Sequence, residues 1–272
     1  MKKSIVLFIA LLTLYSFSQT AKPSQLLNIA AKQRMIVQKL CKDKIYHSLG
    51  IKNEETLKSI NNYILIFETN LKVLNMNLAA TNVKTKIEKV GLLWNAYKTN
   101  LQDETDVKNS ASAIYYSNNE IFNSCEALLS DVYAYLATLP KDSEEKFNQE
   151  DLNQLGSGAR KLRMLSQRVC FYYAYYFNDI DKVVASTELQ RASDTIDLIL
   201  STLAINENNT PQSEVMISEM LNDWQSIKKP ESKPLSTSLQ SKPVNLITMY
   251  DSMNKFYEKA DKLAAYSSYL LK

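Results

Sequence analysis

The chain has 272 residues, of which 45% are apolar, with only 4 Gly and 6 Pro. This share of Gly and Pro is about a third of ordinary usage, which argues against collagen, low-complexity disorder and turn-rich β-sandwiches or barrels. Dinucleotide-binding and P-loop folds also need clustered glycines. With 1 His and 3 Cys, a multi-histidine metal site is excluded, and no metal or cofactor is expected. The composition favours an all-α protein.

Residues 1–18 have the pattern of a secretory signal peptide. Two lysines precede the apolar run Ile5–Leu14, and Ser16 and Ser18 provide the small residues of a cleavage site. The run is short for a membrane span, and no later segment is apolar for long enough to cross a bilayer. We therefore favour a cleaved signal over an uncleaved anchor, and we expect the mature chain in the periplasm or outside the cell, without stable membrane insertion.

The charge balance argues against two classes of partner. Removing residues 1–18 takes away 2 of the 32 basic residues and none of the 29 acidic ones, so the mature net charge is 30 − 29, or +1. Binding to nucleic acid or to a membrane surface through basic residues needs clustered positive charge. Neither partner is expected.

Apolar residues recur at helical spacing along nearly the whole chain. The spacing predicts helices over 24–47, 54–80, 82–102, 107–139, 149–178 and 181–206, a shorter helix ending at 228, and a last helix over 244–271. Pro140 ends the first four, and a loop rich in Pro and Ser covers 229–243. Two sets of four helices predict two tandem antiparallel four-helix bundles, with domains at 19–140 and 141–272 after the signal.

An internal repeat supports this division. Residues 26–41 align without gaps on residues 155–170, with identical residues at seven of sixteen positions and an offset of 129. The tryptophans, Trp94 and Trp224, are 130 residues apart. We interpret the chain as a tandem duplication of one unit of about 130 residues.

One face of the repeated helix is retained between the copies, whereas the core-facing residues have changed. The retained face carries Arg34, Gln38 and Cys41 in the first copy and Arg163, Gln167 and Cys170 in the second. Two interpretations remain open. The face is either a solvated stripe or a bundle–bundle contact without a ligand, or the two faces meet across a pseudo-twofold axis. In the second case both Arg would hold a small anion, and both Gln would add neutral donors.

The same residues carry a resemblance to a known family. Residues 161–168, Lys-Leu-Arg-Met-Leu-Ser-Gln-Arg, resemble the Arg-Met-Leu-Ser-Gln-Arg motif of the PilJ-type, or NarX-like, sensor domain. That domain is the N-terminal extracytoplasmic part of type IV pilus methyl-accepting chemotaxis transducers and of nitrate/nitrite sensor kinases. Residues 28–35 are similar to it as well, and the resemblance covers 24–271.

The resemblance implies a periplasmic four-helix sensor bundle. In nitrate-sensing members the arginine of this helix binds nitrate across a dimer interface, a role that would fall here on Arg34 and Arg163, with Met35 and Met164 beside them in the motif. Val37 replaces the family's Ser, and neither copy has the Ser-Leu-Arg-Met-Gln-Ser-Tyr-Arg form of the nitrate sensors, so nitrate itself is not specifically expected. No kinase or methyl-accepting region follows, so a membrane signalling protein is the expected partner.

Other chemistry-bearing residues have simpler explanations. Cys41 and Cys170 either form a disulfide between the units or are two buried thiols, and Cys125 is expected in the core. The aromatic run 171–177 is more typical of core packing than of a ligand pocket. The acidic residues of 103–106 are typical of a polar turn before a helix.

The sequence offers no candidate for catalysis. The single histidine, His47, is isolated and is expected to be solvated or to cap a helix end, so no nucleophile–base pair can be named. Two function classes therefore remain. The leading one is an exported sensor-type protein that binds a small anion, and the alternative is a structural or interaction scaffold without a small-molecule ligand.

Overall fold

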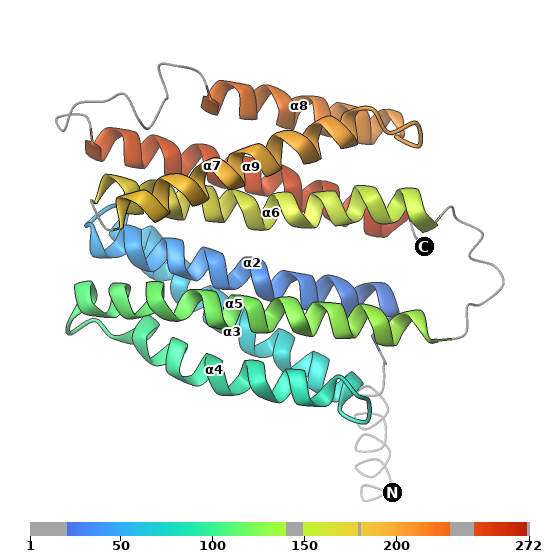
Figure 1. Cartoon of the computed structure of the whole chain (residues 1–272), viewed down its shortest axis with the longest axis horizontal. Coiled ribbons are helices and arrows are strands. Elements are labelled where there is room, and N and C mark those ends of the chain that lie inside the picture. The colour runs from blue at the N-terminus through green and yellow to red at the C-terminus, as the bar shows by residue number, and fades with distance from the viewer. Residues whose placement is uncertain (1–20, 140–148, 179–180, 229–241, 271–272) are drawn as a thin grey trace, which may run out of the picture.

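A computed structural model describes residues 21–139, 149–178, 181–228 and 242–270 (Figure 1). Within these ranges the structure has eight helices and no strand, which confirms the all-α prediction. No helix in this part of the chain is long and apolar enough to cross a membrane. The helices are α2 (Pro23–Ser48), α3 (Asn53–Leu78), α4 (Lys84–Gln102), α5 (Val107–Ala137), α6 (Gln149–Phe177), α7 (Lys182–Ala204), α8 (Pro211–Lys228) and α9 (Lys242–Leu270).

The helix ends lie within two residues of the predicted ones. The predicted signal peptide, Pro140 with the expected domain boundary, and residues 229–241 of the predicted loop lie outside the described residues.

Local residue chemistry sets several helix ends. Gly50 takes a left-handed conformation with φ 72° after α2, which costs a glycine little. The residues that precede α3 and α7, Lys52 and Asp181, are also left-handed, with φ 51° and φ 45°. They are 129 residues apart, so the two copies enter their second helix in the same way. Asp106 caps α5 by accepting a hydrogen bond from the Asn109 backbone N–H at 3.1 Å.

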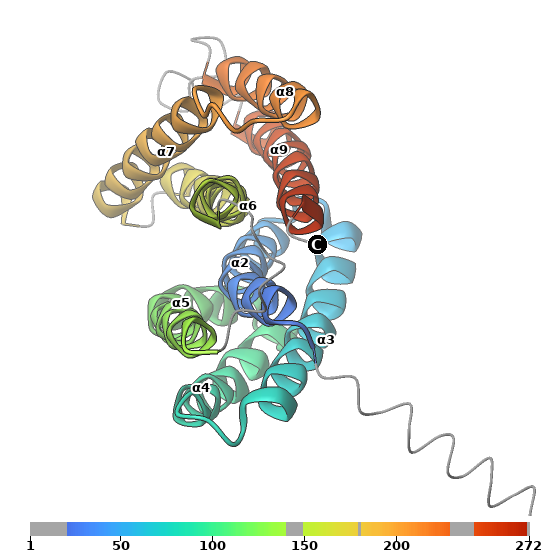
Figure 2. The ribbon, with the colours of Figure 1, turned by 90° about the vertical axis from the view of Figure 1, so that its right-hand side faces the viewer.

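The contacts between helices are those of helical bundles. In the first helical set, α2 to α5, consecutive helices pack together and α5 closes the ring against α2. The second helical set, α6 to α9, closes in the same way through α6 and α9. The two sets meet where α2 packs on α6, and Figure 2 shows these two helices in the middle of the molecule when it is seen end-on.

The two central helices are buried on almost all sides. Nearly every residue of 30–46 in α2 and of 162–175 in α6 is buried. The outer helices instead bury one stripe at helical spacing, as Ile60, Ile64 and Phe67 do in α3. A central helix faces its own set on one side and the other set on the opposite side. Both the core-facing and the retained faces of α2 are therefore in the interior.

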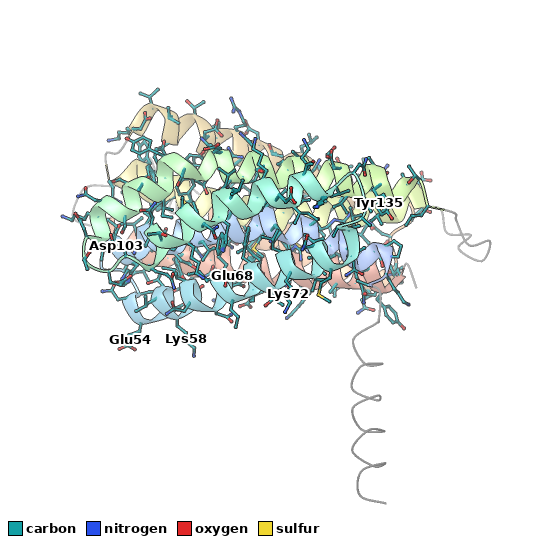
Figure 3. The ribbon with its side chains drawn as sticks, turned by 90° about the horizontal axis from the view of Figure 1, so that it is seen from below. Glu54, Lys58, Glu68, Lys72, Asp103 and Tyr135 are labelled. Carbon is teal, nitrogen blue, oxygen red and sulfur yellow. The ribbon has the colours of Figure 1, made fainter. Side chains whose placement is uncertain are left out.

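The two sets repeat one polar contact. In each, a carboxylate on the second helix accepts hydrogen bonds from the indole N–H and the lysine ammonium of the third helix. The two trios are Glu68 with Trp94 and Lys98, and Asp197 with Trp224 and Lys228. Figure 3 shows Glu68 about halfway along the side of the molecule that α3 and α4 form. The internal repeat thus extends to side-chain contacts outside the motif helices.

Candidate functional site

The four Arg and Gln residues of the retained face are buried. The exposed fraction is 5% for Arg34, 1% for Gln38, 2% for Arg163 and 0% for Gln167. The retained face is therefore not a solvated stripe. The reason is that α2 and α6 are the central helices, so the face opposite each helix's own core is covered as well.

Each of the two buried arginines pairs with an acid of the last helix in its own set. Arg34 Nη1 lies 2.5 Å from Glu126 Oε1 on α5, and Arg163 Nη1 lies 2.6 Å from Asp261 Oδ1 on α9. Arg163 also donates from Nη2 to Asn28 Oδ1 on α2 at 3.1 Å, which joins the two helical sets. Bonds of this kind between charged groups are stronger than neutral ones, so both guanidinium groups are held in place.

The pairing leaves polar capacity unused. Among the described residues, the buried side-chain N and O atoms without a hydrogen-bond partner are Nε of Arg34 and Arg163 and Oε1 of Gln38 and Gln167. Leaving a buried polar atom unpaired costs ~1–3 kcal/mol, and such atoms are rare in native folds. These four atoms belong to the four Arg and Gln residues of the retained face. The retained face therefore leaves two charged donors and two acceptors unused.

A cavity of about 840 Å³ opens beside one of these arginines, between α2, α5, α6 and α7. Its polar lining includes Arg34, Glu126, Arg160 and Lys161, and much of the remaining wall is aliphatic. Arg163, Gln38 and Gln167 are not among the lining residues, so the cavity is open to one of the two predicted arginines and not to both. The methionines of the motif, Met35 and Met164, are buried in the apolar core and do not line the cavity.

Arg160 is a site residue that the sequence analysis missed. It is partly buried, and its guanidinium has no hydrogen bond or ion pair to any described residue. Burial, together with the positive charges of Arg163 and Arg34, lowers the pKa of Arg160 to about 10. In the aligned repeat its counterpart is Ala31. Arg160 could have been found from this difference between the copies. A comparison limited to identical positions does not include it.

The three cysteines are free and buried. Cys41 and Cys170 are therefore two buried thiols in the structure and do not form a disulfide. Cys170 Sγ lies 3.2 Å from the Tyr46 hydroxyl. Burial raises the pKa of Cys170 to about 11 and raises those of Cys41 and Cys125 further, so these thiols stay protonated at neutral pH.

The first copy also buries a charge cluster for which the sequence gives little warning. Lys42 and Asp43 are fully buried, with Lys42 Nζ 3.2 Å from Asp43 Oδ1 and 2.7 Å from Asn254 Oδ1 on α9. Lys39 Nζ lies 3.4 Å from Asp43 Oδ2. Tyr250 on α9 donates its hydroxyl proton to Asp43 at 3.1 Å. The cluster therefore ties the first helical set to the second.

The second copy fills the equivalent volume with aromatic rings. Residues 171–173, which align with 42–44, are Phe-Tyr-Tyr and are buried. Tyr175 stacks on Tyr115 of α5 at a ring-centroid distance of 4.1 Å. The aromatic run is core at this end of α6, and the two copies use different chemistry at the same place.

The acidic turn before α5 neutralises a buried lysine. Lys44 Nζ donates to the Asp103 carbonyl at 2.7 Å and to Glu104 Oε1 at 3.2 Å. His47, expected from the sequence to be solvated or to cap a helix end, lies in the last turn of α2 with its side chain 10% exposed and its Nε2 2.8 Å from Glu104 Oε2. These residues stabilise the end of α2 and leave no group aimed at a ligand.

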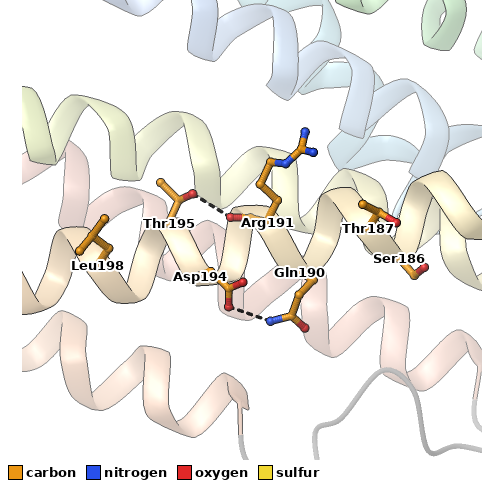
Figure 4. A pocket seen from close by; sticks show the side chains of 7 residues that line it. All are labelled: Ser186, Thr187, Gln190, Arg191, Asp194, Thr195 and Leu198. Atoms are coloured by element: carbon orange, nitrogen blue, oxygen red, sulfur yellow. Dashed lines mark hydrogen bonds between the residues drawn. The ribbon is translucent and has the colours of Figure 1, made fainter.

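A second hollow lies on the outer surface of α7, with a volume of about 640 Å³ (Figure 4). All of its described lining residues belong to α7. Their polar groups bond within that helix, as Gln190 does to Asp194 at 2.7 Å and Thr195 to the Arg191 carbonyl at 2.7 Å. A face of one helix with its polar groups already paired does not converge on a ligand.

Comparisons with protein-family models, with curated proteins and with solved structures give no match. Within the described ranges, no group of three or more His, Cys, Asp or Glu side chains is arranged to hold a metal ion. The functional assignment therefore depends on the geometry of the candidate site. This site has a pair of buried arginines with unused donors and a cavity that is open to one of them.

Proposed function

We propose that this protein is an exported, PilJ-like sensor-type binding protein made of two tandem antiparallel four-helix bundles, 19–140 and 141–272. It holds a small anion where the bundles meet, without a signalling output of its own. A membrane signalling protein reads the bound state. Arg34 and Arg163 supply the positive charge.

One observation carries this proposal. The four Arg and Gln positions of the retained face are also the positions of the unpartnered buried atoms. An oxyanion would accept from the free Nε–H of an arginine whose Nη1 already pairs with an acid. A hydroxyl or N–H of the ligand, or a water bound with it, would donate to Oε1 of the glutamine one helical turn away. Binding would replace an unpaired state with a paired one.

The second candidate is the structural scaffold. It is supported by the ion pairs of Arg34 with Glu126 and of Arg163 with Asp261, which already neutralise both guanidinium charges. In that function, buried water would satisfy the four unpaired atoms. The contact between α2 and α6 would then serve only to hold the molecule together.

A thermal-shift titration separates the two candidates. The mature protein is heated with nitrate, acetate, sulfate or phosphate, and the same is done for a double variant, Arg34→Gln with Arg163→Gln. Glu126 and Asp261 are 39% and 40% exposed, so water can solvate them when their partners are removed. The matched control is Lys32→Gln with Lys262→Gln, which removes the same charge at two lysines that do not line the cavity.

A ligand that binds only the folded state raises the unfolding midpoint with its concentration. We expect at least one anion to do so in the wild type and in the lysine control, and not in the arginine variant. If no anion raises the midpoint, or if the arginine variant responds like the wild type, the scaffold is the better description.

A further inference from the structure

The cavity between α2, α5, α6 and α7 contains a positive charge without an acid partner. Arg160 lines it and has no ion pair to a described residue. Arg34 lines it as well, is 5% exposed and keeps an unpaired Nε. Two guanidinium groups with unused donors thus meet at one hollow.

The charges around this cavity do not cancel. Among its described lining residues, Arg34, Arg160 and Lys161 contribute three positive charges and Glu126 contributes one negative charge, so the lining has a net charge of 3 − 1, or +2. The lowered pKa of Arg160 agrees with this excess. The excess favours an anion, and the ion pair of Arg34 with Glu126 leaves Arg160 as the partly buried charge without an acid partner.

The position of Arg160 depends on a neighbouring glycine. A Cβ placed on Gly156 would lie 2.9 Å from Arg160 Nη1 and 2.9 Å from Ser267 Oγ. The guanidinium therefore occupies the space that a side chain at 156 would take. This room lets the charged end of Arg160 lie back along α6 toward its N-terminus, the direction that long helical side chains prefer.

The walls of the cavity favour a ligand that is partly apolar. The aliphatic lining residues are Leu27, Leu129, Leu198, Ile199 and Leu203. Ligand pockets typically have volumes of ~300–1,000 Å³, and about 840 Å³ is far more than a bare inorganic oxyanion fills. Nitrate or acetate would leave these walls in contact with water, whereas an alkyl chain would cover them.

We infer that the cavity takes a carboxylate with an aliphatic tail of medium length, with the carboxylate on Arg160 and the tail against the leucine and isoleucine walls. This inference rests on the proposed anion-binding function and names the ligand class for the part of the site that is open to Arg34. A planar carboxylate suits the two-pronged donor geometry of a guanidinium.

The test measures binding of acetate, butanoate, hexanoate and octanoate to the whole mature chain by titration calorimetry, with nitrate alongside. Each added methylene should strengthen binding, because it removes apolar surface from water. We expect hexanoate to bind at least tenfold more tightly than acetate or nitrate. Arg160→Gln should weaken hexanoate binding at least tenfold, whereas the charge control Lys262→Gln, at an exposed lysine of α9 that does not line the cavity, should change it less than twofold.

The outcomes separate this inference from the function on which it rests. If nitrate and acetate bind as tightly as hexanoate, and depend on Arg34 and Arg163 but not on Arg160, the inference fails and the proposed function stands. Equal weakening by Arg160→Gln and Lys262→Gln would also overturn it, because general attraction would then explain the binding. No binding of any anion overturns both. Arg160 has no bonding partner to lose, so the unfolding midpoint of Arg160→Gln should match the wild type.

Discussion

At the scale of single residues, the first copy contains a buried cluster with a net positive charge. Lys39 and Lys42 face one carboxylate, Asp43, and burial lowers the pKa of Lys42 to about 8 despite that carboxylate. The pKa of Asp43 is lowered, because the two ammonium charges and a hydrogen bond from Ser59 at 2.6 Å outweigh its burial. Asp43 is therefore the residue that stabilises the charged forms of the buried Lys39 and Lys42.

Two substitutions should have unequal effects on stability. Lys42→Met leaves one buried ammonium opposite one carboxylate and removes the cost of burying Lys42, so the free energy of unfolding should change by less than about 1 kcal/mol. Asp43→Asn leaves two ammonium groups without a carboxylate and should cost about 3 kcal/mol. Urea denaturation followed by circular dichroism measures both. Equal losses for the two variants would contradict this assignment.

At the scale of the helix, α6 has two glycines with different packing roles. A Cβ on Gly158 would lie 3.1 Å from Leu203 Cδ2 and 3.3 Å from Ile199 Cγ2, both on α7. At Gly156 the neighbouring atoms are the ends of flexible side chains. The first glycine allows two helices to approach each other, and the second makes room for Arg160.

We expect three glycine-to-alanine variants to separate these roles. In a helix, Ala is favoured over Gly by ~1 kcal/mol, and Gly91→Ala should gain about that much, because its nearest neighbour, Leu71 Cδ2, would be 3.7 Å away. Gly158→Ala should instead lose about 1 kcal/mol or more, because overpacking outweighs the propensity. Gly156→Ala should leave stability nearly unchanged and weaken hexanoate binding. Unfolding curves and calorimetry measure these effects, and a stabilising Gly158→Ala would refute the close packing.

The whole molecule encloses many groups that ionise at high pH. Burial raises the pKa values of Cys41, Cys125 and Cys170 above their ordinary value of 9.0, and it raises those of Tyr46 and Tyr97 well above 10.0. Below pH 9 these groups are protonated in both the folded and the unfolded chain. Above pH 9 the unfolded chain loses these protons first, so stability is lost as pH rises.

The free energy of unfolding should therefore fall between pH 9 and pH 11. Lys42 and Arg160 act in the opposite direction, because their pKa values are lowered from 10.5 to about 8 and from 12.5 to about 10, but these two groups are outweighed by three thiols and several tyrosines. Urea titrations at fixed pH under reducing conditions measure the trend. In Cys125→Ala, the decline should be shallower than in the wild type. A stability that stays constant or rises up to pH 11 would show that the thiols and tyrosines are not buried as described.

The helices and the retained face could be predicted because both depend on periodic signals. Long amphipathic segments place helix ends to within two residues, and two aligned copies separate Arg34 and Gln38 from the positions that drift. The burial of Lys42 and Asp43 could not be predicted, because charged residues normally indicate a solvated face. They are covered only when the second helical set packs on the first.

The cavity was beyond prediction for a related reason. Its walls come from four helices of both sets, and their relative position is a tertiary property. The internal repeat predicts one shared site for Arg34 and Arg163. In the structure each arginine has its own acid, and Arg160 and Arg34 line the cavity. The retained arginines predict the region of the site. The charge without an acid partner belongs to Arg160, which is present in the second copy alone.

Joining the two halves in one chain removes a constraint that a symmetric dimer would impose. In a dimer of identical subunits, any residue beside the twofold axis appears twice. Here the position equivalent to Arg160 is Ala31 in the other half, and the position equivalent to Lys42 is Phe171. The chain therefore has one cavity with a free arginine and one buried charge cluster. It should bind one ligand per molecule, with a simple saturation curve and no cooperativity between equivalent sites.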